Sequence, residues 1–174
     1  TLAMYSLISE TIVNQYTSTN HPNSKYLRIE GNQAYIGVKN ENSPIKFTAI
    51  ERINLNNFTL DAKIDFSNHF PTSFTPDNFY ATDFALTNNY LITAVNYDRS
   101  FTDGSGVSRI DMASKILVFD KNDFSFVQEV EEKEALNIDE SGSFHEINYG
   151  AVFYDSSHFY VSKFFDADYS NGNF

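Results

Sequence analysis

The sequence from Ile116 to Val130 reads ILVFDKNDFSFVQEV, and this stretch decides the fold. Its first four residues are apolar, and Asn122 and Asp123 follow as residues that tolerate turn geometry. Apolar residues then alternate at Phe124 and Phe126, with Val130 at the end of the run. A period of two is typical of a strand with one buried face. The stretch therefore predicts a strand, a short turn and a second strand.

Two other stretches share this pattern, at offsets of 48 and 66 residues and without a gap. They read LAMYSLISETIVNQY from Leu2 to Tyr16 and IERINLNNFTLDAKI from Ile50 to Ile64. Their turns fall at Ile8-Ser9 and Asn56-Asn57. Helical patterning is weak, and only Glu131 to Ile138 could form a short helical turn. Internal repetition of this kind indicates a repeat architecture.

A second motif, a polar turn followed by a β-prone run, precedes each later copy of the first. The sequences align at Asn32, Asn88 and Ser157, with offsets of 56 and 69, and a further strand is expected before each turn. The three runs are Gly31 to Val38, Asn88 to Val95 and Ser156 to Lys163, and the preceding strands are Tyr26 to Ile29, Thr82 to Leu86 and Tyr149 to Phe153.

The two motifs together predict an all-β chain of four-stranded antiparallel units repeated in series, which is the organisation of β-propeller blades. Residues 1–16 would supply the third and fourth strands of one blade, 24–66 and 80–130 two whole blades, and 147–174 the first two strands of another. We thus expect a single partial β-propeller segment over 1–174. A β-sandwich or an open meander is the alternative, although neither readily gives collinear copies with turns in matching places.

The chain would thus contain half a blade, two whole blades and a further half blade, and this arrangement has two explanations. The chain is either a fragment of a larger propeller or a unit whose two half blades complete each other. Three blades are fewer than the usual four to eight, so such a unit would need a partner. Two copies related by a two-fold axis would make six blades.

Composition excludes some functions and leaves others open. The formal net charge of −11 opposes binding to nucleic acid and to anionic membrane surfaces. The chain has no cysteine, so it has no disulfide and no thiolate metal site. No apolar run approaches the roughly 20 residues that span a bilayer. We therefore expect neither a nucleic-acid partner nor a membrane span.

The repeat pattern resembles β-propeller repeats in a general way over nearly all of the chain. The marks of WD and kelch repeats are missing, because the sequence has no Trp and no Gly-Gly pair. The irregular blades are most similar to propellers of bacterial envelope and secreted proteins, including surface lipoproteins that bind small ligands. This resemblance assigns no subfamily, and it implies an extracellular or envelope location.

Candidate binding residues lie in the long connections that join the second strand to the third, or one blade to the next. Long loops on a rigid frame commonly carry binding residues. Arg99 and Arg109 bracket the longest of them, and a guanidinium fork suits an anionic ligand, although pairing with nearby aspartates is the simpler reading. The predicted ligand-binding set is Asp98, Arg99, Asp103, Arg109, His145 and Glu146.

A calcium site is a further hypothesis, and no other cofactor is predicted. Asp166, Asp168 and Asn171, with Ser170, supply the oxygen ligands that Ca²⁺ prefers. The stretch fails the EF-hand pattern, because Asn171 stands where the invariant Gly belongs. The simpler reading is a hairpin loop that ends in an Asn-Gly turn.

No recognisable catalytic constellation is present, so the sequence favours a non-catalytic propeller that binds a ligand or partner. The alternative is part of a propeller enzyme, of the hydrolase or quinone-dependent type, whose site is completed by other blades. A purely structural surface protein is a third reading. Which ligand is bound does not follow from the sequence.

Overall fold

The described residues of the computed structural model are 1–19, 23–39, 47–70, 79–102, 106, 108–131 and 145–167. They are almost wholly extended, with one short 3₁₀ helix. The chain divides into two compact units, Thr1–Phe74 and Thr75–Phe174. Each unit is described by itself.

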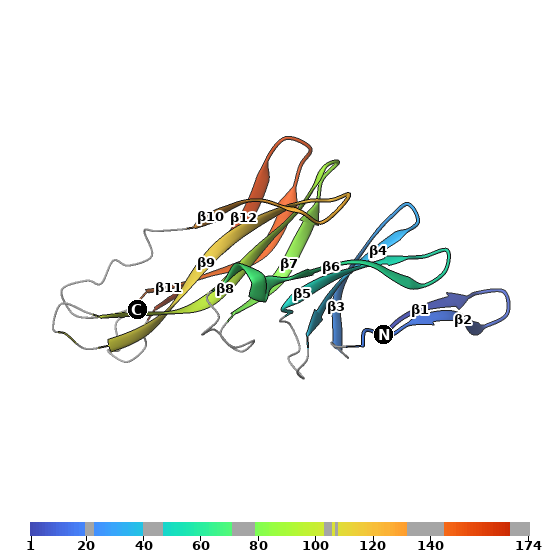
Figure 1. Cartoon of the computed structure of the whole chain (residues 1–174), viewed down its shortest axis with the longest axis horizontal. Coiled ribbons are helices and arrows are strands. Elements are labelled where there is room, and N and C mark those ends of the chain that lie inside the picture. The colour runs from blue at the N-terminus through green and yellow to red at the C-terminus, as the bar shows by residue number, and fades with distance from the viewer. Residues whose placement is uncertain are drawn as a thin grey trace. The chain divides into compact units, whose positions relative to one another are not determined.

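The first unit holds a two-stranded and a four-stranded antiparallel sheet, coloured blue to green in Figure 1. The order of the larger sheet follows the sequence, β3-β4-β5-β6, and a 3₁₀ helix η1, Phe66–His69, follows β6. The strands are β1 (Leu2–Ser6), β2 (Thr11–Tyr16), β3 (Asn23–Glu30), β4 (Gln33–Lys39), β5 (Ala49–Asn54) and β6 (Thr59–Asp65).

The second unit repeats this plan with the small sheet last. Its four-stranded sheet has the order β7-β8-β9-β10, and β11 pairs with β12. The strands are β7 (Phe79–Leu86), β8 (Tyr90–Thr102), β9 (Ser108–Asp120), β10 (Phe126–Glu131), β11 (His145–Tyr154) and β12 (Phe159–Ala167). The all-β class and the four-stranded antiparallel sheets are thus confirmed, and each sheet is open, with two edge strands.

The hairpins β1–β2, β5–β6 and β9–β10 share their irregularities as well as their sequence pattern. Each turn has a residue with positive φ at the same aligned position: Glu10 (53°), Phe58 (56°) and Phe124 (63°). Each second strand then has a bulge three residues later, at Val13, Asp61 and Val127. A bulge bends a strand and increases its twist. The three hairpins are therefore copies of one structural unit.

Local hydrogen bonds explain why these turns form. The side chain of Asn54 accepts the backbone N–H of the residue two positions on, at 2.9 Å, and Asp120 does the same at 2.7 Å. The N–H groups of Phe58 and Phe124 then close the turns onto the carbonyl oxygens of Asn54 and Asp120. A left-handed backbone costs a non-glycine residue about 1–3 kcal/mol. Both phenyl rings are buried, which offsets that cost.

The hairpins β3–β4, β7–β8 and β11–β12 are also copies of one another and are called the first set below, whereas β1–β2, β5–β6 and β9–β10 are called the second set. The first set corrects the sequence alignment by one residue. In β7–β8 the backbone N–H of Thr87 donates a hydrogen bond to the carbonyl oxygen of Tyr90. In β11–β12 the N–H of Asp155 donates to the carbonyl oxygen of His158. These bonds align Asn32 with Asn89, not with Asn88. A one-residue slip matters because it exchanges the two faces of a strand.

The first strands of these hairpins also share a bulge. The register shifts at Tyr26 in β3, between Ala81 and Phe84 in β7, and between Tyr149 and Val152 in β11, which are equivalent places in the three copies. In the second unit, Asp83 uses this position to bind the neighbouring layer, because its Oδ2 accepts the N–H of Val152 at 3.1 Å.

In each unit the small hairpin packs on one face of the large sheet. Leu2 and Tyr16 pack against a buried cluster on β4 and β5 that includes Ile36 and Ile53. In the second unit, Val152 packs with Ala85 and Ala94, together with partly buried residues of β9, β11 and β12. Face-to-face contact of apolar side chains is the main stabilising term in such layers.

The central strands are apolar on both faces. Along β8, Ile92 and Ala94 face the β11–β12 hairpin, whereas Leu91 and Val95 belong to the opposite face. All seven residues from Leu91 to Tyr97 are buried. A strand with this pattern requires a layer on each side of its sheet.

Replacing Phe124 tests the repeated turn. Phe124→Ala should lower the free energy of unfolding by about 3–5 kcal/mol, because it removes a buried ring and leaves the left-handed backbone in place. Phe126→Ala, in the same hairpin at a half-exposed position, should cost less than half as much. Urea unfolding of both variants measures the difference, and equal losses would contradict the assigned role of Phe124.

Candidate functional site

Strands β8 and β9 are the longest of those described, with 13 residues each. Pairing with β7 ends at Phe79 opposite Tyr97, and pairing with β10 ends at Glu131 opposite Lys115. Beyond these points, residues 98–102 of β8 and 108–112 of β9 continue as a two-stranded ribbon. This segment is called the ribbon below.

The ribbon contains three of the residues predicted to bind a ligand. Asp98 lies opposite Met112, Arg99 opposite Asp111, and Arg109 opposite Phe101. The predicted connection bracketed by Arg99 and Arg109 is therefore wrong in its bounds, because both residues lie in strands. Polar residues and weak alternation hid the strand in the sequence. Asp103 lies outside the described residues.

The β11–β12 hairpin contains three more of the predicted residues. His145 pairs with Ala167, and Glu146 lies directly opposite Asp166. Both stretches were expected in connections, whereas the structure assigns them to strands. Like charges opposite each other on neighbouring strands are unfavourable unless a cation or a donor intervenes. Asp168 and Asn171 lie outside the described residues, so the calcium site stays a prediction.

These two groups lie at the same end of the second unit. In Figure 1 the turns at 87–90 and 155–158 lie at the upper end of this unit, and the ribbon and the start of β11 lie at its lower left. The structure thus places the strand segments that carry the predicted residues of two hairpins at a single end of this unit.

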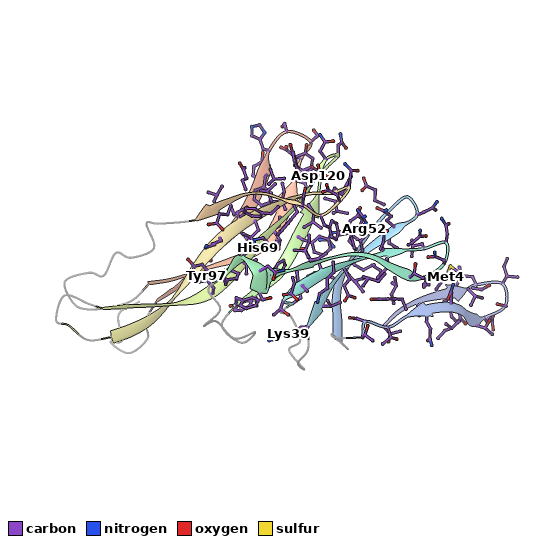
Figure 2. The ribbon with its side chains drawn as sticks, in the orientation of Figure 1. Met4, Lys39, Arg52, His69, Tyr97 and Asp120 are labelled. Atoms are coloured by element: carbon purple, nitrogen blue, oxygen red, sulfur yellow. The ribbon has the colours of Figure 1, made fainter. Side chains whose placement is uncertain are left out.

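The root of the ribbon is held by polar contacts, of which one is buried. Ser114 donates to Asn96 Oδ1 at 2.6 Å, between the directly opposed positions of β8 and β9. Lys115 Nζ lies 5.7 Å from the centre of the Tyr97 ring and 3.3 Å from Glu129 Oε1. Figure 2 shows Tyr97 beside this root. The ribbon therefore extends from a fixed base, which a binding segment requires.

A buried carboxylate in the first unit was not predicted. Glu51 on β5 is almost fully buried, and its two oxygens accept the hydroxyl of Tyr16 at 3.0 Å and that of Ser18 at 2.7 Å. Burial, together with the charge of Glu51 and the hydrogen bond to it, raises the pKa of Tyr16 to about 12. No spacing signal could have found this cluster, because Glu51 is more than thirty residues from both of its donors. It fixes the β1–β2 hairpin to the sheet, so its role is structural.

The turn before β12 contains another carboxylate with donors on several sides. The backbone N–H groups of His158 and Ser157 and the hydroxyl of Tyr160 lower the pKa of Asp155 to about 2. His158 Nδ1 lies 3.8 Å from Asp155 Oδ1. The cluster is a capped turn, and all its members are exposed or half-exposed.

The described residues contain neither a cluster of metal-binding side chains nor a helix that could span a membrane. No group of three or more His, Asp or Glu side chains in this part of the chain converges as a metal site would require. No helix among these same residues is long and apolar enough to cross a membrane.

Comparison with known proteins gives no further guide. No family model matches the chain, and no curated protein or solved structure matches it at a significant level.

Removing a donor to Glu51 should destabilise the first unit. Tyr16→Phe and Ser18→Ala should each lower the free energy of unfolding by about 1–3 kcal/mol, because a buried carboxylate oxygen loses a hydrogen bond. Tyr5→Phe is the matched control, since Tyr5 lies on the exposed face of the same hairpin. Chemical denaturation of the three variants measures the effect, and a loss in the control as large as in Tyr16→Phe would rule out this role for Glu51.

The same pair predicts a pH dependence. The raised pKa of Tyr16 means that its contribution to stability is complete below about pH 10 and is lost as the pH rises through about 12. The stability difference between the natural chain and Tyr16→Phe should therefore shrink over this range. Denaturation at several alkaline pH values tests this, and a constant difference would mean that Tyr16 does not titrate as expected.

Proposed function

We propose that this chain is part of a β-propeller that binds a ligand without catalysing a reaction, through the end of the second unit that carries the ribbon. The observation that supports this proposal is that polar strand ends from β8–β9 and β11–β12 lie together at that end.

The repeated hairpins support the propeller architecture. Each four-stranded sheet joins one hairpin of each set, with equivalent turns and bulges throughout. A sandwich covers only the inner face of each sheet. Sheets that are apolar on both faces, as around β8, fit the radial stacking of a propeller better.

The charge pattern of the ribbon favours an anionic ligand. Arg99 is opposite Asp111 in the register, a residue of opposite charge. Arg109 is opposite Phe101, an uncharged residue, which leaves Arg109 as the better candidate for a carboxylate or phosphate. His145, at the start of β11, could contribute a second donor at the same end.

Binding can be tested with a panel of small carboxylates and phosphates. We expect at least one compound to raise the melting temperature of the natural chain. In Arg109→Ala the affinity for that compound should fall about tenfold or more, while the melting temperature without ligand stays unchanged. Arg28→Ala removes the same charge from β3 in the other unit and should leave the affinity unchanged.

Two results would overturn this proposal. If no carboxylate or phosphate raises the melting temperature, the site does not take an anionic ligand. If Arg109→Ala lowers the melting temperature of the free protein along with the affinity, Arg109 supports the fold and does not form the site.

A further inference from the structure

Strands β1 and β12 each have an open edge. Among the described residues, β1 pairs only with β2, and β12 pairs only with β11. An open edge presents a row of backbone donors and acceptors that can pair with another strand. Each of these two edges is therefore a potential interaction surface.

The two small sheets are complementary halves of the repeat. The β11–β12 hairpin belongs to the set that includes β3–β4 and β7–β8, whereas β1–β2 belongs to the set of β5–β6 and β9–β10. In both complete sheets, a hairpin of the first set joins a hairpin of the second set through β4–β5 or β8–β9 pairing. A β12–β1 pair would repeat that junction.

Both complete sheets predict the same register for this pair. Gln33 lies opposite Asn54 in one junction, and Tyr90 lies opposite Asp120 in the other. In the proposed β12–β1 pair, His158 is equivalent to Gln33 and Tyr90, and Ser6 is equivalent to Asn54 and Asp120. Counting along the strands from this pair places Phe159 opposite Tyr5, Tyr160 opposite Met4, and Val161 opposite Ala3.

The exposed side chains fit this junction. Tyr5 is 54% exposed, although its equivalents Ile53 and Phe119 are fully buried. Tyr160 is 49% exposed, although its equivalents Tyr35 and Ile92 are buried. Apolar residues at buried positions of the repeat are thus uncovered in the two small sheets, which indicates that a layer is missing on each.

The faces of the two hairpins also match. Phe159 and Val161 already pack toward the β7–β10 sheet, and the register would place Tyr5 and Ala3 on this same side. Leu2 already packs toward the β3–β6 sheet, and Tyr160 would join it on that side. A combined sheet would therefore extend both existing apolar surfaces without inverting a strand.

We propose that β12 of one copy of this chain pairs antiparallel with β1 of a second copy, in the register that joins Val161 to Ala3. The inference rests on the propeller architecture of the proposed function. Pairing within one chain would close a ring of three four-stranded sheets, fewer than the four to eight of known propellers. Two copies would form two such junctions and a ring of six, with the two-fold symmetry that is common among dimers.

Engineered cysteines test the register directly, because the natural chain has no cysteine. Opposed residues of antiparallel strands have Cα atoms about 4.5–5.5 Å apart, within the range of a disulfide. The full 174-residue chain with Ala3→Cys and Val161→Cys should form a covalent dimer on mild oxidation, seen on a non-reducing gel. Met4→Cys with Tyr160→Cys is a second variant at two exposed positions, in case the first disturbs packing.

The matched control carries Tyr5→Cys and Val161→Cys, which is two residues out of register. Its diagonal positions are about 7–8 Å apart, too far for an unstrained disulfide. The control should therefore give far less covalent dimer than either variant in register. Light scattering of the natural chain should give twice the chain mass of 19.8 kDa.

Three outcomes would overturn the inference. A disulfide within one chain would show that the two edges of a single copy pair. Equal cross-linking in the control would show that the register is wrong. A folded chain of single mass that does not cross-link would show that the edges do not meet. None of these outcomes bears on ligand binding at Arg109, so failure of the strand pairing can be distinguished from failure of the binding proposal.

Discussion

The need to cover two apolar faces governs this structure. A hairpin with one apolar face can be satisfied by a single neighbour, but β8 has Ile92 and Ala94 on one face and Leu91 and Val95 on the other. The β11–β12 hairpin covers the first of these faces in its own unit. Burial of apolar area is the dominant favourable term in folding, so each sheet is stable only as part of a stack.

The shared bulges explain how such sheets can stack without flattening. An extra residue in the last strand of each second-set hairpin increases the local twist, and it falls at the aligned positions Val13, Asp61 and Val127. In β6 the extra residue also forms an ion pair, since Asp61 Oδ2 accepts a hydrogen bond from Nε of the nearly buried Arg52 at 2.8 Å. Figure 2 labels Arg52 in this sheet. The bulge thus serves geometry in all three copies and ion pairing in one.

Sequence predicted the strands well where alternation and turn chemistry agreed, as in the copies around Asn56-Asn57 and Asn122-Asp123. It aligned Asn32 with Asn88 because two asparagines stand side by side, and only the backbone hydrogen bonds of Thr87 identify the turn residue. The ribbon was missed for a different reason, because its polar residues show little of the apolar alternation that marks a strand. Glu51 was not found because its partners come from a distant strand, and packing between layers leaves no local signal.

The difference between the two ends of the hairpins explains why function is expected at one of them. Turns of the first set place only two residues between their closing positions, and turns of the second set keep the same left-handed residue. At the opposite end the connections vary widely: β4 and β5 are separated by residues 40–48, β8 and β9 by 103–107 after a long ribbon, and β10 and β11 by 132–144. A turn that closes a hairpin cannot change length without shifting its register, whereas a connection between hairpins can. The free end can therefore acquire binding residues while the frame stays constant, and this is the end where Arg109 and His145 lie.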